Sequence, residues 1–376
     1  MKLILILLLT SLVGCSSIKK IKDFKSPFEK QTRETSDFVV RWSKNLDPIY
    51  NSGNLPISSS SPMIHEDILY LGNLSGEMVA YDLENGTELW KEKQATAINA
   101  KASIFGDSVV YGTMSGRLVS RHYLTGALNF AIDLGAPIES EIVTGGGRMY
   151  VHLRSHKIVA MDATTGKIFW GYKRSVPFAT TLQRVSKVLP FKDKLIVGFA
   201  DGNLVALSRD EGIVLWSQKV SKGVKFVDVD ASPVYFNGFI VSGAANDKLR
   251  FIDPSNGVIV KTIDIVIGHS PIVVGNELIV GSVFGEIGRI DKNGKLTYKR
   301  KHVNSGISSI VKWNKGFAVA TMAGQIHQVD NKSFESTEVF ELGYSQSAVF
   351  GFLQQTGNYL AVYSSRNRLY VFKNNQ

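Results

Sequence analysis

The sequence predicts an all-β fold, an eight-bladed β-propeller of four-stranded antiparallel blades, and three observations support this prediction. First, short alternating apolar runs are separated by turn residues. In residues 67–90, Ser75-Gly76 and Asn85-Gly86 supply the backbone freedom that tight turns need. Second, a glycine, often followed four residues later by an aromatic residue, recurs about every 40 residues, which is typical of propeller blades. Third, a strand near the N-terminus lacks a partner that the C-terminal hairpin can supply.

The repeat is strongest where an aspartate or serine, a glycine and a tryptophan are spaced four residues apart. Three copies fit this description: Asp82, Gly86 and Trp90; Asp162, Gly166 and Trp170; Ser208, Gly212 and Trp216. Weaker copies surround Gly126, Gly257 and Gly294. We expect the glycine to occupy a turn with positive φ and the indole to pack between neighbouring blades, where it buries a large apolar area. A structural role, and not cofactor binding, is therefore predicted for Trp42, Trp90, Trp170 and Trp216.

Each blade is expected to contain an inner hairpin, and eight such hairpins can be assigned. They cover residues 67–82, 108–121, 148–162, 194–208, 239–253, 277–291, 316–330 and 359–373. In the first hairpin, Ile68, Tyr70, Met78 and Ala80 alternate with their neighbours, as expected of half-buried strands. The strand at residues 38–42 has no hairpin of its own, and the last hairpin has no outer strand. We therefore expect the N-terminal strand to complete the last blade and to close the ring without a free edge.

The N-terminus resembles that of a bacterial lipoprotein. A basic start, an apolar run at residues 3–9 and small residues before Cys15 predict a signal peptide over residues 1–14, because the run is too short for a transmembrane helix. Residues 12–15, Leu-Val-Gly-Cys, resemble the lipobox, whose cysteine is lipidated and becomes the first residue of the mature chain. The alternative is a conventional signal peptide with a chance cysteine. Ser16 follows Cys15 in place of an aspartate, which by resemblance to Gram-negative lipoproteins favours the outer membrane.

Residues 15–36 are expected to form a lipidated, polar tether, and residues 37–376 a single propeller domain. The tether contains the densest basic run of the chain, which either keeps it solvated or attracts anionic head groups: Lys19, Lys20, Lys22, Lys25 and Lys30. The rest of the net charge of +10 follows no pattern of basic residues interleaved with aromatic ones. No nucleic-acid partner is therefore expected.

No catalytic motif is found, so we expect no enzymatic activity, no cofactor and no metal. His152 and His156 are four residues apart but straddle a hairpin, so they do not share a helical face. The repeat in residues 76–90 resembles that of quinoprotein dehydrogenases, many of which use an adjacent cysteine pair and a calcium ion. With Cys15 as the sole cysteine, such a pair is impossible, and no calcium loop rich in Asp and Asn is evident. A periplasmic dehydrogenase dependent on the quinone PQQ stays the alternative from the enzyme class.

Two connections between blades are longer than the others, at residues 175–190 and 219–230, and long loops on a regular scaffold often carry binding sites. The second connection contains Asp228 and Asp230, which are predicted at alternate strand positions and so on one side of the chain. They either contact a partner through charged hydrogen bonds or cap the loop and face water.

The lipobox, the basic tether, the N-terminal tryptophan strand and repeats such as Gly-Asn-Leu-Val-Ala-Leu at residues 202–207 resemble those of the BamB family, outer-membrane lipoproteins of the β-barrel assembly machinery. In that family a similar Asp-x-Asp-x-x-Pro segment helps bind BamA, the barrel-forming subunit, which implies Asp228 and Asp230 as contact residues. A second contact segment, Leu-x-Leu-Arg, corresponds to residues 180–184. Its equivalents here are Leu182 and Arg184, although the first leucine is missing and the arginine is displaced by one position.

The resemblance implies a scaffold that is lipid-anchored at the outer membrane, faces the periplasm and assists the assembly of β-barrel proteins. Its expected partner is a BamA-like protein and its complex. Unfolded outer-membrane client proteins are a further expected partner, through pairing with exposed blade edges. A third interpretation is a lipid-anchored module that binds a small ligand or peptidoglycan, for which the sequence offers no convergent site.

Overall fold

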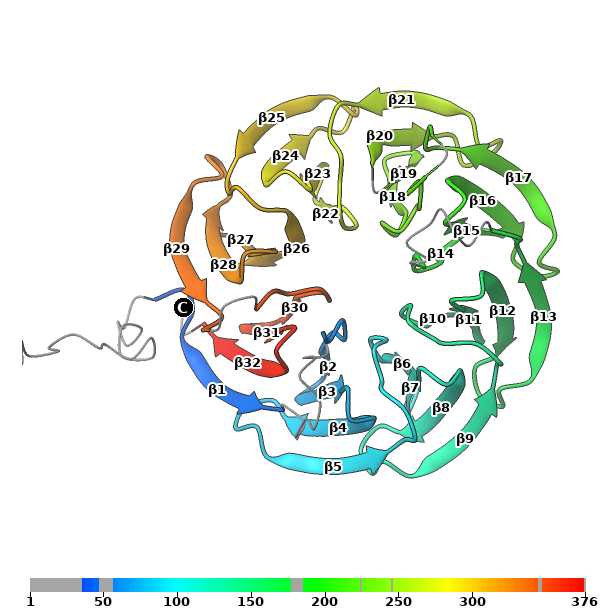
Figure 1. The fold of residues 1–376 in the computed structure, drawn as a ribbon, viewed down its shortest axis with the longest axis vertical. Coiled ribbons are helices and arrows are strands. Elements are labelled where there is room, and N and C mark those ends of the chain that lie inside the picture. The colour runs from blue at the N-terminus through cyan, green and yellow to red at the C-terminus, as the bar shows by residue number, and fades with distance from the viewer. Residues whose placement is uncertain are drawn as a thin grey trace, which may run out of the picture. The chain divides into compact units, whose positions relative to one another are not determined.

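The structure is a computed structural model, and it describes residues 36–46, 57–176, 185–223, 225–244, 246–343 and 347–374. The chain divides into two units, Met1–Ser36 and Asp37–Gln376, and the second contains all the described strands. The predicted signal peptide and Cys15 lie outside the described residues. Eight four-stranded sheets surround a common axis, which confirms the predicted eight-bladed propeller (Figure 1). No helix in the described ranges is long and apolar enough to cross a membrane.

Each blade runs outward from an inner strand through two middle strands to an outer strand. Blades one and two consist of β2 (Met63–His65), β3 (Ile68–Gly72), β4 (Glu77–Asp82) and β5 (Glu88–Lys93), then β6 (Ser103–Phe105), β7 (Ser108–Gly112), β8 (Arg117–His122) and β9 (Leu128–Asp133). Blades three and four consist of β10 (Val143–Gly145), β11 (Arg148–His152), β12 (Lys157–Asp162) and β13 (Ile168–Lys173), then β14 (Leu189–Phe191), β15 (Lys194–Gly198), β16 (Asn203–Ser208) and β17 (Val214–Lys219).

The second half of the ring repeats this order. Blades five and six consist of β18 (Val234–Phe236), β19 (Phe239–Ala244), β20 (Asp247–Ile252) and β21 (Ile259–Ile263), then β22 (Ile272–Val274), β23 (Glu277–Gly281), β24 (Glu286–Ile290) and β25 (Leu296–Lys301). Blades seven and eight consist of β26 (Ile307–Trp313), β27 (Gly316–Thr321), β28 (Gln325–Asp330) and β29 (Ser336–Glu341), then β30 (Gln354–Thr356), β31 (Tyr359–Tyr363), β32 (Arg368–Lys373) and the N-terminal β1 (Val40–Asn45). All eight predicted hairpins lie within one residue of the observed ones.

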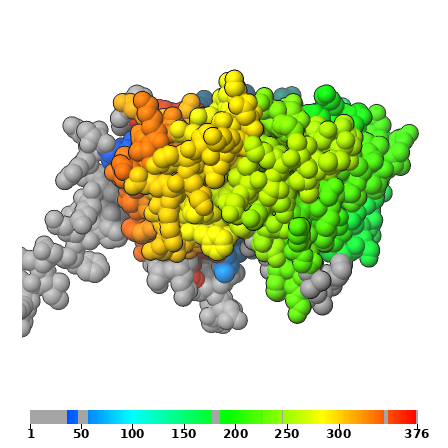
Figure 2. All heavy atoms as spheres, turned by 90° about the horizontal axis from the view of Figure 1, so that it is seen from above, coloured from blue at the N-terminus to red at the C-terminus, as the bar shows by residue number. Residues whose placement is uncertain are grey.

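The middle strands are buried on both faces, so the predicted half-buried alternation was wrong. In β3, Ile68, Leu69, Tyr70 and Leu71 are all buried. The reason is that each blade packs against a neighbour on both sides, which leaves no solvent face for a middle strand. Alternation appears instead on the outer strands, where β5 has the pattern of an edge exposed to water. Figure 2 shows the green, yellow and orange blades packed side by side into one continuous wall.

A tryptophan on the outer strand clasps the next blade at four of the blade junctions. Trp90 Nε1 donates to Tyr123 O at 2.9 Å, and a Cβ on Gly126 would lie 2.9 Å from the same indole. The other three pairs follow the same geometry, with the glycine at a φ of 73–79°: Trp42 with Gly86, Trp170 with Gly212 and Trp216 with Gly257. The glycine is thus needed both for the left-handed turn and for the close approach of the ring.

The N-terminal strand closes the ring as predicted, because β1 pairs antiparallel with β32 and Trp42 lies opposite Val371. The residues just before β1 are fixed by a tryptophan that the sequence repeat does not include. Trp313, the last residue of β26, donates its indole N–H to Asp37 O at 2.9 Å. Asn314 Nδ2 donates to Asp37 Oδ1 at 2.6 Å, and the ring of Phe38 packs against Phe372.

The Trp–Gly clasp predicts a large effect for one methyl group. In Gly257→Ala, the new Cβ would lie 2.6 Å from Trp216 Cε3 at a φ of +79°, whereas Gly135, at a φ of +78°, has nothing within 4 Å. The two alanines therefore share the backbone strain and differ in the clash. We expect Gly257→Ala to lower the free energy of unfolding by about 1–3 kcal/mol more than Gly135→Ala, measured by urea denaturation. An equal decrease in the free energy of unfolding in the two variants would mean that the Trp216 indole moves aside without loss of stability.

Candidate functional site

The described residues of the long connections predicted as binding segments lie on one face of the propeller, here called the connector face. In an antiparallel blade, the turn between the two middle strands and the connection to the next blade leave from the same end. Backbone hydrogen bonds join them: Ile98 N donates to Asn73 O at 3.0 Å in blade one, and Val229 N donates to Phe199 O at 3.1 Å in blade four. The connector face is thus built from these turns and connections.

Five of the connections are anchored to the blade that they leave by a space beside a glycine, here called the glycine slot. A glycine near the connector-face end of the first middle strand leaves space that a β-branched side chain of the connection occupies. A Cβ on Gly72 would lie 2.2 Å from Ile98 Cγ2, and a Cβ on Gly198 would lie 2.7 Å from Val229 Cγ1. The same slot forms at three more blades: Gly112 with Ile138, Gly243 with Ile267 and Gly281 with Ile307. The sequence contained this signal as a recurring glycine, which the turn-based repeat overlooked.

Val229 therefore fixes the two aspartates that the sequence singled out, since they flank it. Asp228 is fully buried, whereas Asp230 is partly exposed. The predicted strand was wrong: the connection forms no strand before β18, because its backbone bonds to the turn of blade four in place of a strand ladder. Leu182 and Arg184, the other predicted contact residues, lie outside the described residues.

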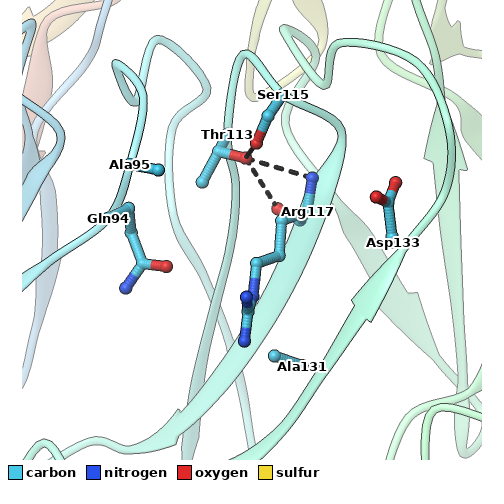
Figure 3. A pocket seen from close by; sticks show the side chains of 7 residues that line it. All are labelled: Gln94, Ala95, Thr113, Ser115, Arg117, Ala131 and Asp133. Carbon is cyan, nitrogen blue, oxygen red and sulfur yellow. Dashed lines mark hydrogen bonds between the residues drawn. The ribbon is translucent and has the colours of Figure 1, made fainter.

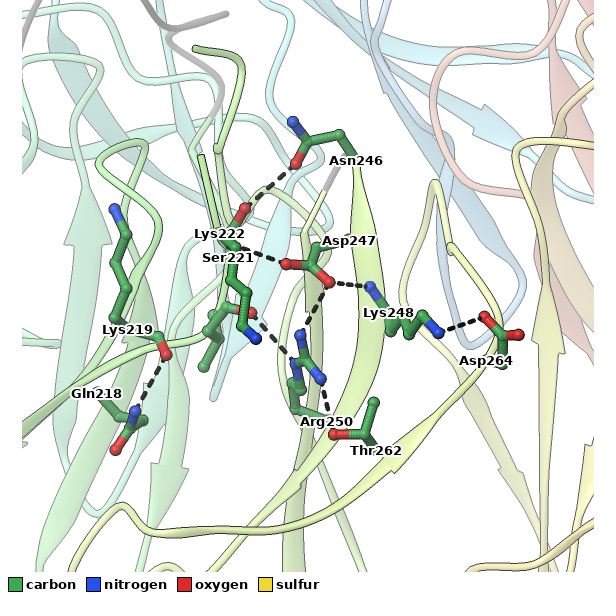
Figure 4. A network of polar contacts seen from close by, with 11 residues as sticks. Gln218, Lys219, Ser221, Lys222, Asn246, Asp247, Lys248, Arg250, Thr262 and Asp264 are labelled. Atoms are coloured by element: carbon green, nitrogen blue, oxygen red, sulfur yellow. Dashed lines mark hydrogen bonds and ion pairs between the residues drawn. The ribbon is translucent and has the colours of Figure 1, made fainter. Parts of the chain in front are cut away.

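The start of the same connection is held by a polar network on blade five (Figure 4). Asp247 accepts a hydrogen bond from Lys222 N at 2.8 Å and pairs with Arg250 NH2 at 2.8 Å. Arg250 also donates to Val220 O at 3.3 Å and to Thr262 Oγ1 at 2.7 Å. A guanidinium and a carboxylate that are both nearly buried thus hold the backbone in one conformation.

Buried histidines lie close to this connection. His152 Nδ1 donates to Ser186 O at 2.9 Å, and burial lowers its pKa to about 3, so the ring is neutral. Burial also lowers the pKa of His156, although the carboxylates of Asp201 and Asp228 oppose that shift. Asp228 is thus close enough to His156 to act on its charge. No cluster of three or more His, Cys, Asp or Glu side chains in the described ranges is arranged to hold a metal ion.

Phe226 is a feature of this connection that sequence reasoning missed. The residue is 51% exposed, and its φ is +53°, in the left-handed region that phenylalanine rarely adopts. An exposed aromatic ring on a strained backbone is costly for folding alone, and such outliers cluster at functional sites. The available signal was a lone aromatic residue between Lys225 and the aspartates.

Two cavities lie on the connector face. One of about 390 Å³ lies between blades one and two, and Figure 3 shows Arg117 and Gln94 among its lining residues. Its Thr113 hydroxyl is already engaged with the backbone of Arg117, at 3.0 and 3.2 Å. The other, of about 480 Å³, is lined around the propeller axis mostly by residues of the connections between blades, Asp230 among them.

The axial cavity does not fit an acidic quinone cofactor. Its cationic lining residue among those described, Arg154, is paired with Glu139 at 3.2 Å. Burial lowers the pKa of His269, another lining residue, to about 4, which leaves that ring neutral. The carboxylates of Glu139 and Asp230 would repel the carboxylates that such a quinone carries.

Acid is predicted to destabilise the fold through the buried histidines. An unfolded histidine has a pKa near ~6.5, well above the folded values of about 3 for His152 and about 4 for His269. Below pH ~6.5 the unfolded chain binds more protons than the folded chain. The free energy of unfolding therefore decreases as the pH is lowered, by up to about 1.4 kcal/mol per histidine for each pH unit. In His152→Asn, the asparagine amide replaces the Nδ1–H donor but does not titrate. The free energy of unfolding, measured with urea, should therefore decrease less from pH ~7 to ~5 in this variant than in wild type. Equally steep declines would contradict this role of His152.

Comparisons with known proteins now identify the family. The family profile described as outer membrane protein assembly factor BamB matches residues 34–107 and 76–300. A protein of that name from Nitrosomonas eutropha is 22% identical over 267 residues, 66% of this chain and 64% of that protein. Another, from Burkholderia pseudomallei, is 26% identical over 253 residues, 65% of this chain and 64% of that protein. The chain thus spans a little under two thirds of the length of these relatives.

A shorter match links the repeats to enzymes. The quinoprotein alcohol dehydrogenase PedH from Pseudomonas putida is 29% identical over 154 residues, which are 38% of this chain and 26% of that enzyme. The crystal structure of BamB from Moraxella catarrhalis has the same fold, with a TM-score of 0.75 at 19% identity, covering 90% of this chain and 100% of that one. Because the family profile extends over well more than half of its residues, the chain belongs to the family of outer membrane protein assembly factor BamB.

Proposed function

We propose that this protein is a non-enzymatic scaffold in outer-membrane protein assembly, which docks through the connector face onto the periplasmic part of a BamA-like barrel-forming subunit. A lipid on Cys15 would hold it at the outer membrane, facing the periplasm. Family membership supports the general role. The observation that carries the docking site is the connection of residues 220–233, which presents an exposed Phe226 beside the firmly anchored Asp228-Val229-Asp230 segment.

The anchoring of this connection favours binding. Val229 in its glycine slot and the Asp247–Arg250 pair hold the segment at both ends, so little conformational entropy is lost when a partner docks. Aromatic side chains dominate the energy of many protein interfaces, and Phe226 projects such a ring into solvent. Asp228 is buried and would act by shaping the segment, whereas the partly exposed Asp230 is placed to meet the partner.

A quinone-dependent dehydrogenase is the less favoured function. The axial cavity combines two carboxylates with a guanidinium that is already paired, which suits an acidic quinone poorly. The match to PedH covers only 26% of that enzyme.

Phe226→Asn separates docking from folding. Asparagine tolerates a positive φ better than phenylalanine does, so we expect stability to be kept or raised while affinity for the partner falls about tenfold or more. The full-length chain would be extracted from membranes with detergent and used in an affinity pull-down. Wild type should recover a large outer-membrane barrel protein with periplasmic repeats. Phe226→Asn and Asp230→Ala should recover much less of it.

A matched control is Phe284→Asn, which removes a ring that is 62% exposed in the middle turn of blade six on the same face. Recovery by this control together with loss in Phe226→Asn would locate the site on the connection. Undiminished recovery by both folded variants would move the site elsewhere. Failure of wild type to recover any barrel protein would remove the assembly function itself.

A second role, in receiving unfolded client strands, is favoured by the outer strands of blades three to five. They leave backbone groups unpaired at the sheet edge and carry exposed apolar side chains, such as Phe169 on β13, Leu215 on β17 and Val260 on β21. A photo-crosslinker in place of Leu215 should capture nascent barrel proteins. The same group in place of Glu341, on the acidic outer strand β29, should not. Absence of adducts from all three apolar positions would argue against client binding at these edges.

A further inference from the structure

Three charged residues gather where successive blades approach the propeller axis. Lys101, Glu141 and Lys187 each stand two residues before an inner strand, β6, β10 and β14 respectively, and Figure 1 shows these strands facing the axis on neighbouring blades. Lys101 Nζ lies 3.7 Å from Glu141 Oε1, and Lys187 Nζ lies 3.1 Å from Glu141 Oε2. One carboxylate thus serves two ammonium groups from different blades.

The cluster has one positive charge more than its carboxylate neutralises. The side chains of Lys101 and Glu141 are each only 18% exposed, so solvent compensates poorly for that charge. Burial lowers the pKa of Lys101; the carboxylate of Glu141 opposes this shift, and the ammonium of Lys187 adds to it. A partly buried excess cation of this kind is stabilised by a bound anion.

A cavity of about 290 Å³ adjoins the cluster. Glu141 and Lys187 line it, together with the inner strands of blades one to three. The lining hydroxyls already donate to backbone carbonyls: Ser103 Oγ to Ile142 O and Thr144 Oγ1 to Ile104 O. The side-chain donors left to a ligand in this lining are the ammonium of Lys187 and the imidazole of His65. Lys101 adjoins the cavity through Glu141, 3.7 Å from its ammonium. Ammonium groups form strong hydrogen bonds to oxyanions.

We propose that Lys101 and Lys187 form an anion-binding site in the axis of the propeller, which takes a small oxyanion such as phosphate or the phosphate group of a larger molecule. The anion would bridge the two ammonium groups and compete with Glu141 for them. Because of this competition, removing a lysine and neutralising the glutamate should change anion affinity in opposite directions. Removal of either lysine weakens binding, whereas neutralisation of the glutamate strengthens it.

The test is calorimetric titration of the full-length protein with inorganic phosphate at constant ionic strength, with chloride as the balancing anion. Loss of one charge-assisted hydrogen bond should weaken phosphate binding about tenfold in Lys101→Met and in Lys187→Met. Glu141→Gln should bind phosphate several-fold more tightly than wild type. Lys248→Met removes a lysine that pairs with Asp264 on the outer surface, and it should bind as wild type does.

Circular dichroism confirms that each variant is folded. Lys187 is the more exposed of the two lysines, so Lys187→Met provides the result if Lys101→Met fails to fold. A parallel titration with glycerol phosphate distinguishes free phosphate from a phosphate on a larger molecule, by which of the two binds more tightly. The proposal is overturned if wild type shows no heat of phosphate binding beyond that of the chloride control. It is also overturned if affinity is the same in wild type, Lys187→Met and Glu141→Gln.

Discussion

The junction between neighbouring blades is the constraint on which this propeller depends. A blade has two apolar faces, and neither is covered until the next blade packs on it, as the complete burial of β3 shows. The Trp–Gly clasp sets the spacing of that packing. It combines one indole hydrogen bond with an aromatic ring on a turn that admits no side chain, as at Trp90 and Gly126. At the four junctions that contain it, the clasp therefore sets how closely neighbouring blades approach.

Much of the fold was predictable because the relevant signals are local. Turn residues and the spacing of the repeat located all eight hairpins within one residue, and the unmatched strands at the two ends predicted the closure by β1. The burial of both faces was not predictable from one blade, since it depends on contacts between blades. Trp313 does not belong to the repeat. It binds Asp37 at the closing junction, where blade seven meets the N-terminal strand that completes blade eight, and the two residues are far apart in the chain.

The candidate site shows the same division. Asp228 and Asp230 were singled out by sequence, but their environments differ because Val229 between them occupies the glycine slot of blade four. A strand would place both aspartate side chains on one side of the chain. The segment is irregular instead, because its backbone bonds to the turn of blade four. Phe226 was overlooked since neither its exposure nor its positive φ can be read from residue type. Local pattern thus located the segment, and packing between blades determined which of its side chains reach the surface.

The clasp also bears on how such a ring arises and changes size. Four of the outer strands carry an indole that points to the following blade, and four turns accept one from the preceding blade. A unit that carries both halves joins to any copy of itself. Gene duplication therefore lengthens the ring without new interface chemistry, and the copies are then free to diverge at their connections. The closing junction is where uniqueness is required, and there Trp313, Asn314 and Asp37 form contacts that the repeat does not contain.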